Sequence, residues 1–422
     1  MATDTLAAPA RRWIDEAVLL AFLLLAFIGV TPFKSPDPLA TELGAVAQTG
    51  AGDSLRQIAY LAVFAAILYT AWRHRGRRIF ASLPWVLLGL LAWCMASALW
   101  SPEPAITVRR AGLAVVLVLS AMLSVETVGA EKSLKLWSWV LLAVLVINIV
   151  SIRFVANAVH PPSEPDPQLI GNWRGVYSHK NIAGAVGALT ALVFLFFPRS
   201  RGRHKLADLA VVALAIFFTV MTHSKSSLGL LVVAMLAGGV YRIAWRRDID
   251  RTIALVATAL VLVAGVVLFL ADENVVSRLF SDPQQFTGRT AIWQAEIAYI
   301  RDHPLFGAGF GTFADSGTVS PLYKYIGGWV AGVSHGHNGY LQLLVTVGGI
   351  GFVLAFVALV VLPAGDFWRR GALARKALLF SLFVFLALHN LMETDFLEGD
   401  GAAWVAYLLL IAMLANLRRV PA

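Results

Sequence analysis

Cysteine and charged residues are both scarce in this chain of 422 residues. The one cysteine, Cys94, lies inside an apolar run, so the chain can form neither an internal disulfide nor a thiolate metal site. Charged residues make up 14% of the chain and hydrophobic residues 59%. Because soluble globular domains carry about 25% charged residues, this composition excludes that class and indicates a polytopic membrane protein.

Long hydrophobic runs, in contrast, are abundant. A membrane-spanning helix needs about 20 mostly apolar residues, and the chain therefore predicts an all-α fold, a single transmembrane domain over residues 1–422. We expect about twelve spanning helices, near residues 14–31, 57–72, 80–99, 107–125, 135–155, 181–198, 206–222, 227–245, 252–271, 337–362, 376–392 and 402–417. The first run follows two arginines as a signal peptide does, but it lacks a clear small-residue cleavage site and is interpreted as an anchor helix.

Basic residues gather in alternate loops, which sets the expected orientation. The clusters lie at 73–78, 199–205, 246–251 and 368–376. Since Lys and Arg mark cytoplasmic loops, both termini are predicted to be cytoplasmic. A large loop at 272–336 and a second at 156–181 then lie on the external side. The net charge of +9 reflects this topology, and no nucleic-acid surface is expected, because the basic residues sit in short loops.

Twelve of the 34 Lys and Arg residues fall on the external side, where topology does not require them. They are Lys34, Arg56, Arg109, Arg110, Arg153, Arg174, Lys180, Lys225, Arg278, Arg289, Arg301 and Lys324. We expect some of them to bind an anion. Others have plainer interpretations: Arg56 reaches the membrane interface, and Arg109 and Arg110 either do the same or line a polar cavity.

Four of these cations stand beside expected helix starts. Arg174 and Lys180 precede the sixth span, Lys225 precedes the eighth, and Arg289 lies in the first turn of a helix that we expect to run through Asp302. Backbone N–H groups at a helix start favour anions, so these positions suit a phosphate. Ordinary basic residues of solvated loops remain the alternative.

Two histidines, His335 and His337, precede the tenth span. A spacing of two does not place them on one helical face, and no cysteine or nearby carboxylate completes a ligand set, so no metal is predicted. His337 suits proton transfer, or else packing or capping. Near the end of the chain Glu393, Asp395, Glu398 and Asp400 could orient His337, pair with the cations or be solvated.

Three glycines in GAGFGTF (307–313) resemble a nucleotide motif only superficially, because no strand precedes them. We interpret them as a tight turn that lets backbone approach another group closely.

Five segments match a known family in sequence, order and position: RGVYSHKN (174–181), HSKSSLG (223–229), TGRTAIW (287–293), HPLFGAGFGTF (303–313) and HGHNGYLQLLVTVGGIG (335–351). Through them the chain resembles the O-antigen ligase and polymerase superfamily of bacterial inner-membrane proteins, and most of all its exopolysaccharide polymerases. The resemblance covers roughly residues 170–360.

The resemblance implies a GT-C-like, metal-independent, inverting glycosyltransferase with no cofactor. It would move glycan from an undecaprenyl-diphosphate-linked oligosaccharide to a sugar or lipid A core acceptor at the periplasmic face of the bacterial inner membrane. His337, or the adjacent His335, would be the base, and Asn338 and Glu393 would orient it. Arg289 and Lys225, with Arg174 and Lys180, would hold the diphosphate. A flippase and a chain-length regulator would be partner proteins in the bilayer.

Four functions stay open at this point, with a metal-dependent membrane hydrolase as the last. Polymerase is the first and ligase the second, and the sequence does not separate them. Lys225 stands where many ligases have Arg, which keeps the charge but loses the bidentate fork. A transporter is the alternative from another class. It predicts charges at the bilayer midplane between two related halves, whereas the unexplained charges here gather on the external side.

Overall fold

The computed structural model describes residues 9–34, 54–76, 83–164, 167–197, 204–246, 289–314, 320–326, 336–367 and 373–418. Within these ranges the chain forms helices joined by turns, and a single β-bridge between Val159 and Trp173 is the only pairing of extended backbone. The all-α prediction is confirmed there. The expected span at 252–271 lies outside the described residues.

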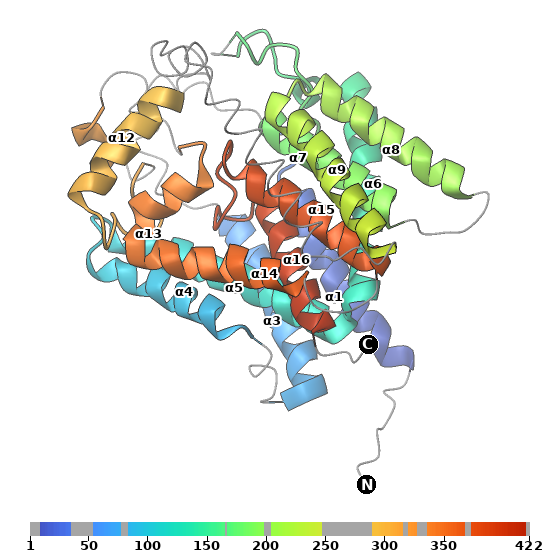
Figure 1. Cartoon of the computed structure of the whole chain (residues 1–422), viewed down its shortest axis with the longest axis horizontal. Coiled ribbons are helices and arrows are strands. Elements are labelled where there is room, and N and C mark those ends of the chain that lie inside the picture. Colours follow the sequence, from blue (N-terminus) through green and yellow to red (C-terminus); the bar gives the residue numbers. More distant parts are fainter. Residues whose placement is uncertain are drawn as a thin grey trace.

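The helices follow the predicted apolar runs closely (Figure 1). In chain order they are α1 (Pro9–Phe27), α3 (Ser54–Arg75), α4 (Trp85–Ala96), η3 (Ser97–Leu99), α5 (Pro104–Val128), α6 (Ala130–Phe154), η4 (Ala156–Ala158), α7 (Lys180–Phe196), α8 (His204–Met221), α9 (Lys225–Arg246), α12 (Arg289–Asp302), η6 (Pro321–Lys324), α13 (Gly339–Phe356), the π-helical turn η8 (Val357–Val361), α14 (Leu362–Asp366), α15 (Leu373–His389) and α16 (Ala402–Leu417). α12 ends at Asp302 with Arg289 in its first turn, as predicted.

Five helical stretches are long and apolar enough to cross a membrane by length and composition. They are α3, α5, α6, α9 and the continuous stretch Gly339–Asp366. Shorter apolar helices include α7 and α16. The molecule is therefore a membrane protein with several apolar helices, and the total of about twelve spans stays a prediction.

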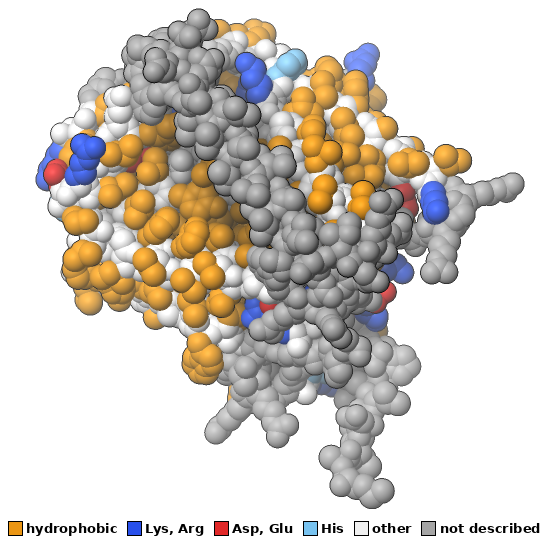
Figure 2. All heavy atoms as spheres, viewed as in Figure 1, with side chains coloured by type: hydrophobic (Ala, Val, Ile, Leu, Met, Phe, Trp, Pro, Cys, Tyr) orange, Lys and Arg blue, Asp and Glu red, His pale blue; other side chains and the backbone are white. Residues whose placement is uncertain are grey.

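α16 and α7 form the centre of the bundle. Every residue of α16 from Ala402 to Ala415 is buried, and α7 packs against α8, α9 and α15. A helix that is apolar all round belongs in such a position. The outer helices instead expose large apolar side chains such as Trp85, Phe154 and Leu236. Figure 2 shows hydrophobic side chains spread widely over one face, with few Lys and Arg side chains among them, as expected of a surface in contact with lipid.

Ion pairs gather at two ends of the bundle. α3 spans about 33 Å at 1.5 Å per residue and carries Arg56 near its start and His74 near its end. His74 pairs with Asp15 at 2.9 Å, whereas Arg56 pairs with Asp400 at 3.3 Å. The first pair belongs to the residues predicted to be cytoplasmic and the second to those predicted to be external. The side of the membrane that each end faces stays a prediction from the charge pattern.

The glycine turn at 307–311 docks on α13 through backbone alone. The N–H groups of Ala308 and Gly309 donate to the carbonyls of Val345 and Thr346 at 2.8 and 2.9 Å. These carbonyls are accessible because α13 is interrupted at Gly348, whose φ is 68°. A Cβ on Gly307 would lie 2.6 Å from the Gly348 nitrogen, so only glycine permits this approach. The predicted close approach of backbone is confirmed, and its partner is α13.

Candidate functional site

Glu393, in the turn between α15 and α16, collects three side chains from distant parts of the chain. Its Oε1 accepts hydrogen bonds from Arg289 Nη2 at 2.7 Å and from Asn181 Nδ2 at 2.6 Å. Its Oε2 lies 3.1 Å from His337 Nδ1. The residue is 7% exposed. Of the roles left open for the four carboxylates, Glu393 both contacts His337 and pairs with a cation.

The surroundings of Glu393 fix its protonation state. Burial alone would raise the pKa of its carboxyl, but the hydrogen bond with His337 and the charge of Arg289 outweigh burial and hold that pKa well below its ordinary value. An ionised carboxylate can only accept hydrogen bonds. His337 Nδ1 must therefore be the donor, which leaves the lone pair of a neutral imidazole on Nε2, the atom a base would use.

The backbone around His337 is held in an unusual conformation. His337 has a φ of 52°, in the left-handed region that non-glycine residues seldom adopt. The next residue, Asn338, caps α13 by accepting from the N–H groups of Tyr340 and Leu341. The N–H of Gly339 lies 2.8 Å from the Asn390 carbonyl and 3.1 Å from that of Glu393. These contacts fix the imidazole against the turn that carries Glu393. Asn338 thus fixes the start of α13 directly after His337.

Arg289 joins α12 to the same turn. Its Nη1 donates to the Met392 carbonyl at 2.5 Å, beside the ion pair of Nη2 with Glu393. The residue is 9% exposed, and its Nε is buried without a hydrogen-bond partner. The planar fork of arginine suits this two-point contact. The guanidinium therefore supports the carboxylate that contacts His337.

Four helix starts converge on this turn. α7 reaches it through Asn181, α12 through Arg289 and α13 through His337. α9 reaches it through Ser227, whose hydroxyl lies 3.4 Å from Nε2 of His389, the last residue of α15. Each helix start carries the positive end of a helix dipole. Together they make this end of the bundle favourable for a negative charge.

The two lysines stand at two of these helix starts. Lys180 is the first residue of α7 and is half-buried, and Lys225 is the first residue of α9 and is exposed. The two starts are neighbours, because a Cβ on Gly184 of α7 would lie 2.7 Å from Ser224. Lys180 and Lys225 therefore lie at the end of the bundle that also holds His337.

Arg174 is more deeply buried than the two lysines and lies within the loop that precedes α7. It is 0% exposed, and its Nε and Nη1 donate to the carbonyls of Asn157 and Ser178 at 2.8 and 3.0 Å. These contacts hold the segment that leads into α7 and presents Lys180. His335 lies outside the described residues. Among the residues that are described, no group of three His, Cys, Asp or Glu is arranged to hold a metal ion.

Sequence reasoning missed three parts of this region. Asn181 ends the quoted RGVYSHKN motif, but nothing in the sequence pairs it with Glu393. His389 contacts Ser227 through Nε2 and Asp395 through Nδ1, which lies 2.7 Å from Asp395 Oδ2. Glu296 of α12 is 0% exposed, and both of its carboxyl oxygens lack a hydrogen-bond partner. A carboxylate inside the apolar run of α12 was the one available signal for Glu296.

A comparison with known families matches the part of the chain that holds several of these residues. Residues 209–357 match the family model described as O-Antigen ligase. The match covers 149 of the 422 residues, about a third of the chain, and supports the resemblance to the O-antigen ligase and polymerase superfamily. The matched stretch includes Lys225, Arg289 and His337, whereas Arg174, Lys180 and Glu393 lie outside it. A search of curated proteins found no match. The O-antigen ligase match confirms the resemblance that the motifs indicated.

Proposed function

We propose that this protein is an inner-membrane glycosyltransferase that moves glycan from a polyprenyl-diphosphate-linked donor to a sugar acceptor at the periplasmic face. One observation carries the proposal: Glu393 holds the imidazole of His337 and the guanidinium of Arg289 where four helix starts meet. This arrangement offers a base and a positively charged site within one region. The superfamily match supports the same reaction class.

The proposed reaction begins with His337. Its Nε2 removes the proton from an acceptor hydroxyl as that oxygen attacks the anomeric carbon of the donor sugar. The new C–O bond forms as the bond between the anomeric carbon and the diphosphate oxygen breaks, so the configuration inverts. The diphosphate leaves with the electron pair. The ionised Glu393 carboxylate stabilises the imidazolium that forms, as the acidic member of a catalytic triad does.

The leaving diphosphate gains negative charge and needs fixed cations and N–H donors. Lys180 and Lys225, at two neighbouring helix starts, supply charge that is accessible from outside the bundle. Arg289 and Arg174 are buried, so in this proposal they do not contact the diphosphate and contribute only their charge to the surrounding potential. Arg289 also holds the Glu393 turn in place, and Arg174 holds the start of α7. No cofactor is part of this mechanism.

Replacement of His337 by Ala tests the base. The variant should insert into the membrane at the wild-type level and form no glycosidic bond, because the acceptor hydroxyl would keep its proton. Full transfer activity in this variant would overturn the assignment. His335→Ala, made in parallel, decides which of the two histidines is needed.

Polymerase is the preferred form of the proposal and ligase the second, and both rest on the family resemblance. Surface polysaccharide from a deletion strain separates them. Single unpolymerised repeats on the cell would indicate a polymerase. Full-length lipid-linked chains left unattached to lipid A core or another acceptor would indicate a ligase. Unchanged polysaccharide would contradict both.

A further inference from the structure

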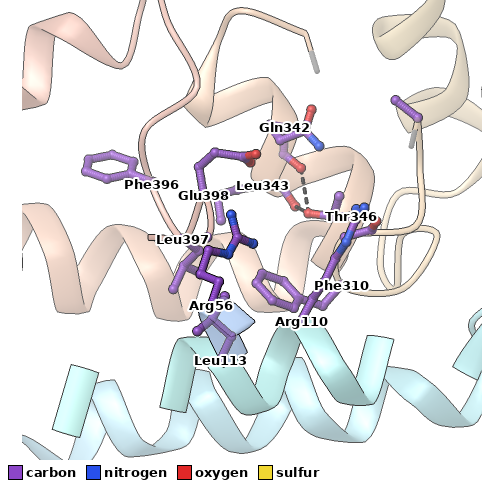
Figure 3. A pocket seen from close by; sticks show the side chains of 13 residues that line it. Arg56, Arg110, Leu113, Phe310, Gln342, Leu343, Thr346, Phe396, Leu397 and Glu398 are labelled. Carbon is purple, nitrogen blue, oxygen red and sulfur yellow. Dashed lines mark hydrogen bonds between the residues drawn. The ribbon is translucent and has the colours of Figure 1, made fainter. Parts of the chain in front are cut away.

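A cavity of about 300 Å³ lies next to the candidate site. α13 lines it with Gln342 and Thr346, and the turn after α15 lines it with Glu398. Arg56 and Arg110 face these residues from α3 and α5 (Figure 3). The volume falls at the lower end of the range for small-molecule sites, roughly 300–1,000 Å³. Arg110 therefore lines a cavity, which is one of the two interpretations that the sequence allowed for it.

The cavity is lined in part by α13 and by the turn after α15, the two elements that also carry His337 and Glu393. Gln342 lies four residues after Asn338, which is about 6 Å along the axis of α13. Its Oε1 also lies 3.4 Å from the N–H of Gly336, the residue before His337. On the other side, Glu398 belongs to the same turn as Glu393. A molecule in the cavity would thus lie about one turn of α13 from the segment that carries His337.

Arg110 is held against the glycine turn. Its Nη1 donates to the Gly311 carbonyl, and a Cβ on Gly311 would lie 2.5 Å from the Arg110 Cδ. Gly311 has a φ of 73°. The third glycine of the turn therefore leaves room for the arginine stem along the cavity wall, and its carbonyl fixes the guanidinium. The donor is set in place before a ligand arrives, which lowers the cost of binding.

The charges of the cavity suit a hydroxyl-rich molecule better than a diphosphate. Arg56 pairs with Asp400 at 3.3 Å, and Glu398 adds a second carboxylate to the lining. A diphosphate in the cavity would meet the Glu398 carboxylate, while the charge of Arg56 is already balanced by Asp400, so its binding is unfavourable. Guanidinium, amide and carboxylate groups together offer donors and acceptors in fixed planes. The rings of Phe310 and Phe396 add an apolar surface, on which the C–H groups of a sugar ring can pack.

We infer that this cavity binds a neutral sugar ring of the acceptor glycan and that Arg110 helps to select it. The inference rests on the proposed transfer reaction, which requires an acceptor hydroxyl beside His337. The donor diphosphate then lies on the other side of the imidazole, toward Lys180 and Lys225.

Binding to the full-length protein in lipid nanodiscs tests this assignment. One probe is a labelled oligosaccharide released by mild acid from the surface polysaccharide of the producing strain, and the other is inorganic diphosphate. Arg110→Ala should weaken oligosaccharide binding about tenfold or more and leave diphosphate binding unchanged. Arg153→Ala is the matched control, because Arg153 is exposed in the last turn of α6, away from the cavity. It should bind both probes as the wild type does.

Weaker diphosphate binding with unchanged oligosaccharide binding would assign the cavity to the donor and overturn the inference. So would unchanged binding of both probes, or an equal loss of both. Should Arg110→Ala fail to insert, Glu398→Gln replaces it, because that side chain is exposed and its loss leaves the glycine turn intact. The same outcomes then decide the question.

Failure of the proposed function gives a different result. If the wild type forms no glycosidic bond from lipid-linked donor, the proposed function fails, and the binding experiment still decides whether the cavity holds a sugar. If the wild type transfers glycan and His337→Ala does not, the function stands. Wild-type oligosaccharide binding by Arg110→Ala would then remove only the cavity assignment.

Discussion

His337 Nδ1 lies 3.1 Å from Glu393 Oε2, although the two residues are 56 positions apart in the chain. One belongs to the segment that opens α13 and the other to the turn that follows α15. The contact fixes which nitrogen of the imidazole carries the proton. It therefore links the electrostatics of a buried carboxylate to the reactivity of the residue that we propose as the base.

Glu393→Gln should lower the rate of glycan transfer roughly 10²–10⁴-fold. The amide keeps the shape of the side chain but loses the negative charge that stabilises an imidazolium, and it can present an N–H to His337 in place of an acceptor. Transfer from a lipid-linked donor, measured at saturating donor, checks this. Glu103→Gln changes a carboxylate in the turn before α5 and should leave the rate unchanged. A Glu393→Gln enzyme with wild-type turnover would show that the carboxylate has no part in the reaction.

The substitutions Arg289→Ala and Lys225→Ala should affect different properties of the protein. Removal of Arg289 leaves the Glu393 carboxylate buried without its cation, so we expect a stability loss of about 3–5 kcal/mol and a lower turnover number. Lys225 is exposed, so its removal should leave thermal stability unchanged and raise the KM for donor about tenfold, equal to about 1.4 kcal/mol. That increase should shrink at high salt, because salt screens exposed charges.

Melting temperatures in detergent and donor titrations separate the two variants. Arg289→Lys refines the first result: it retains a charge but not the fork that contacts both Met392 and Glu393, so it should only partly restore stability. An equal effect of the two alanine variants on both stability and donor KM would contradict the division of roles.

The buried carboxyl of Glu296 should make the protein less stable as the pH rises. Burial raises the pKa of its carboxyl from 4.5 to about 8, so the folded protein binds a proton that the unfolded chain releases between these values. The unfolded state then holds fewer protons, and the free energy of unfolding decreases with pH across this window. Glu296→Gln should remove this contribution and stabilise the protein at pH 8 by a few kcal/mol, at roughly 1.4 kcal/mol per pKa unit.

Thermal unfolding of both proteins between pH 5 and pH 8.5 checks this. The difference in melting temperature should be small at pH 5 and should increase toward pH 8. A constant difference across the range would mean that the carboxyl does not change its protonation on folding. Transfer activity should stay measurable in Glu296→Gln, since the amide retains the volume beside Gly336.

Gly348→Ala should destabilise the protein by more than about 2 kcal/mol. Its φ is 68°, and an added Cβ would lie 2.2 Å from the Leu305 carbonyl oxygen of the segment that leads into the glycine turn. Gly365→Ala in α14 is the matched control, because a Cβ there meets nothing within 4 Å. It should be neutral or slightly stabilising. Similar melting temperatures for the two variants would show that the interruption of α13 does not determine how the turn docks.

The candidate site was predictable from sequence only in part. The motifs around Lys180, Lys225, Arg289 and His337 indicated cations at helix starts and an imidazole before a span, and the helices begin where those motifs predict. The sequence did not distinguish Glu393 from the neighbouring carboxylates, and it left the roles of all of them open. Asn181 and His389 carried no local signal, because hydrogen bonds between residues 212 and 162 positions apart leave no periodicity in the chain.

The sequence by itself determined the elements and their environment. Apolar runs must form helices, because a bilayer supplies no partners for free backbone N–H and C=O groups, and glycines mark the turn where backbones meet. Only the tertiary structure decided which charges face each other. Packing brings four helix starts to one turn, buries Arg289 and Arg174 against acceptors, and leaves Lys225 exposed. Burial and pairing set the protonation of Glu393 and Glu296, and neither is a property of a residue's position in the sequence.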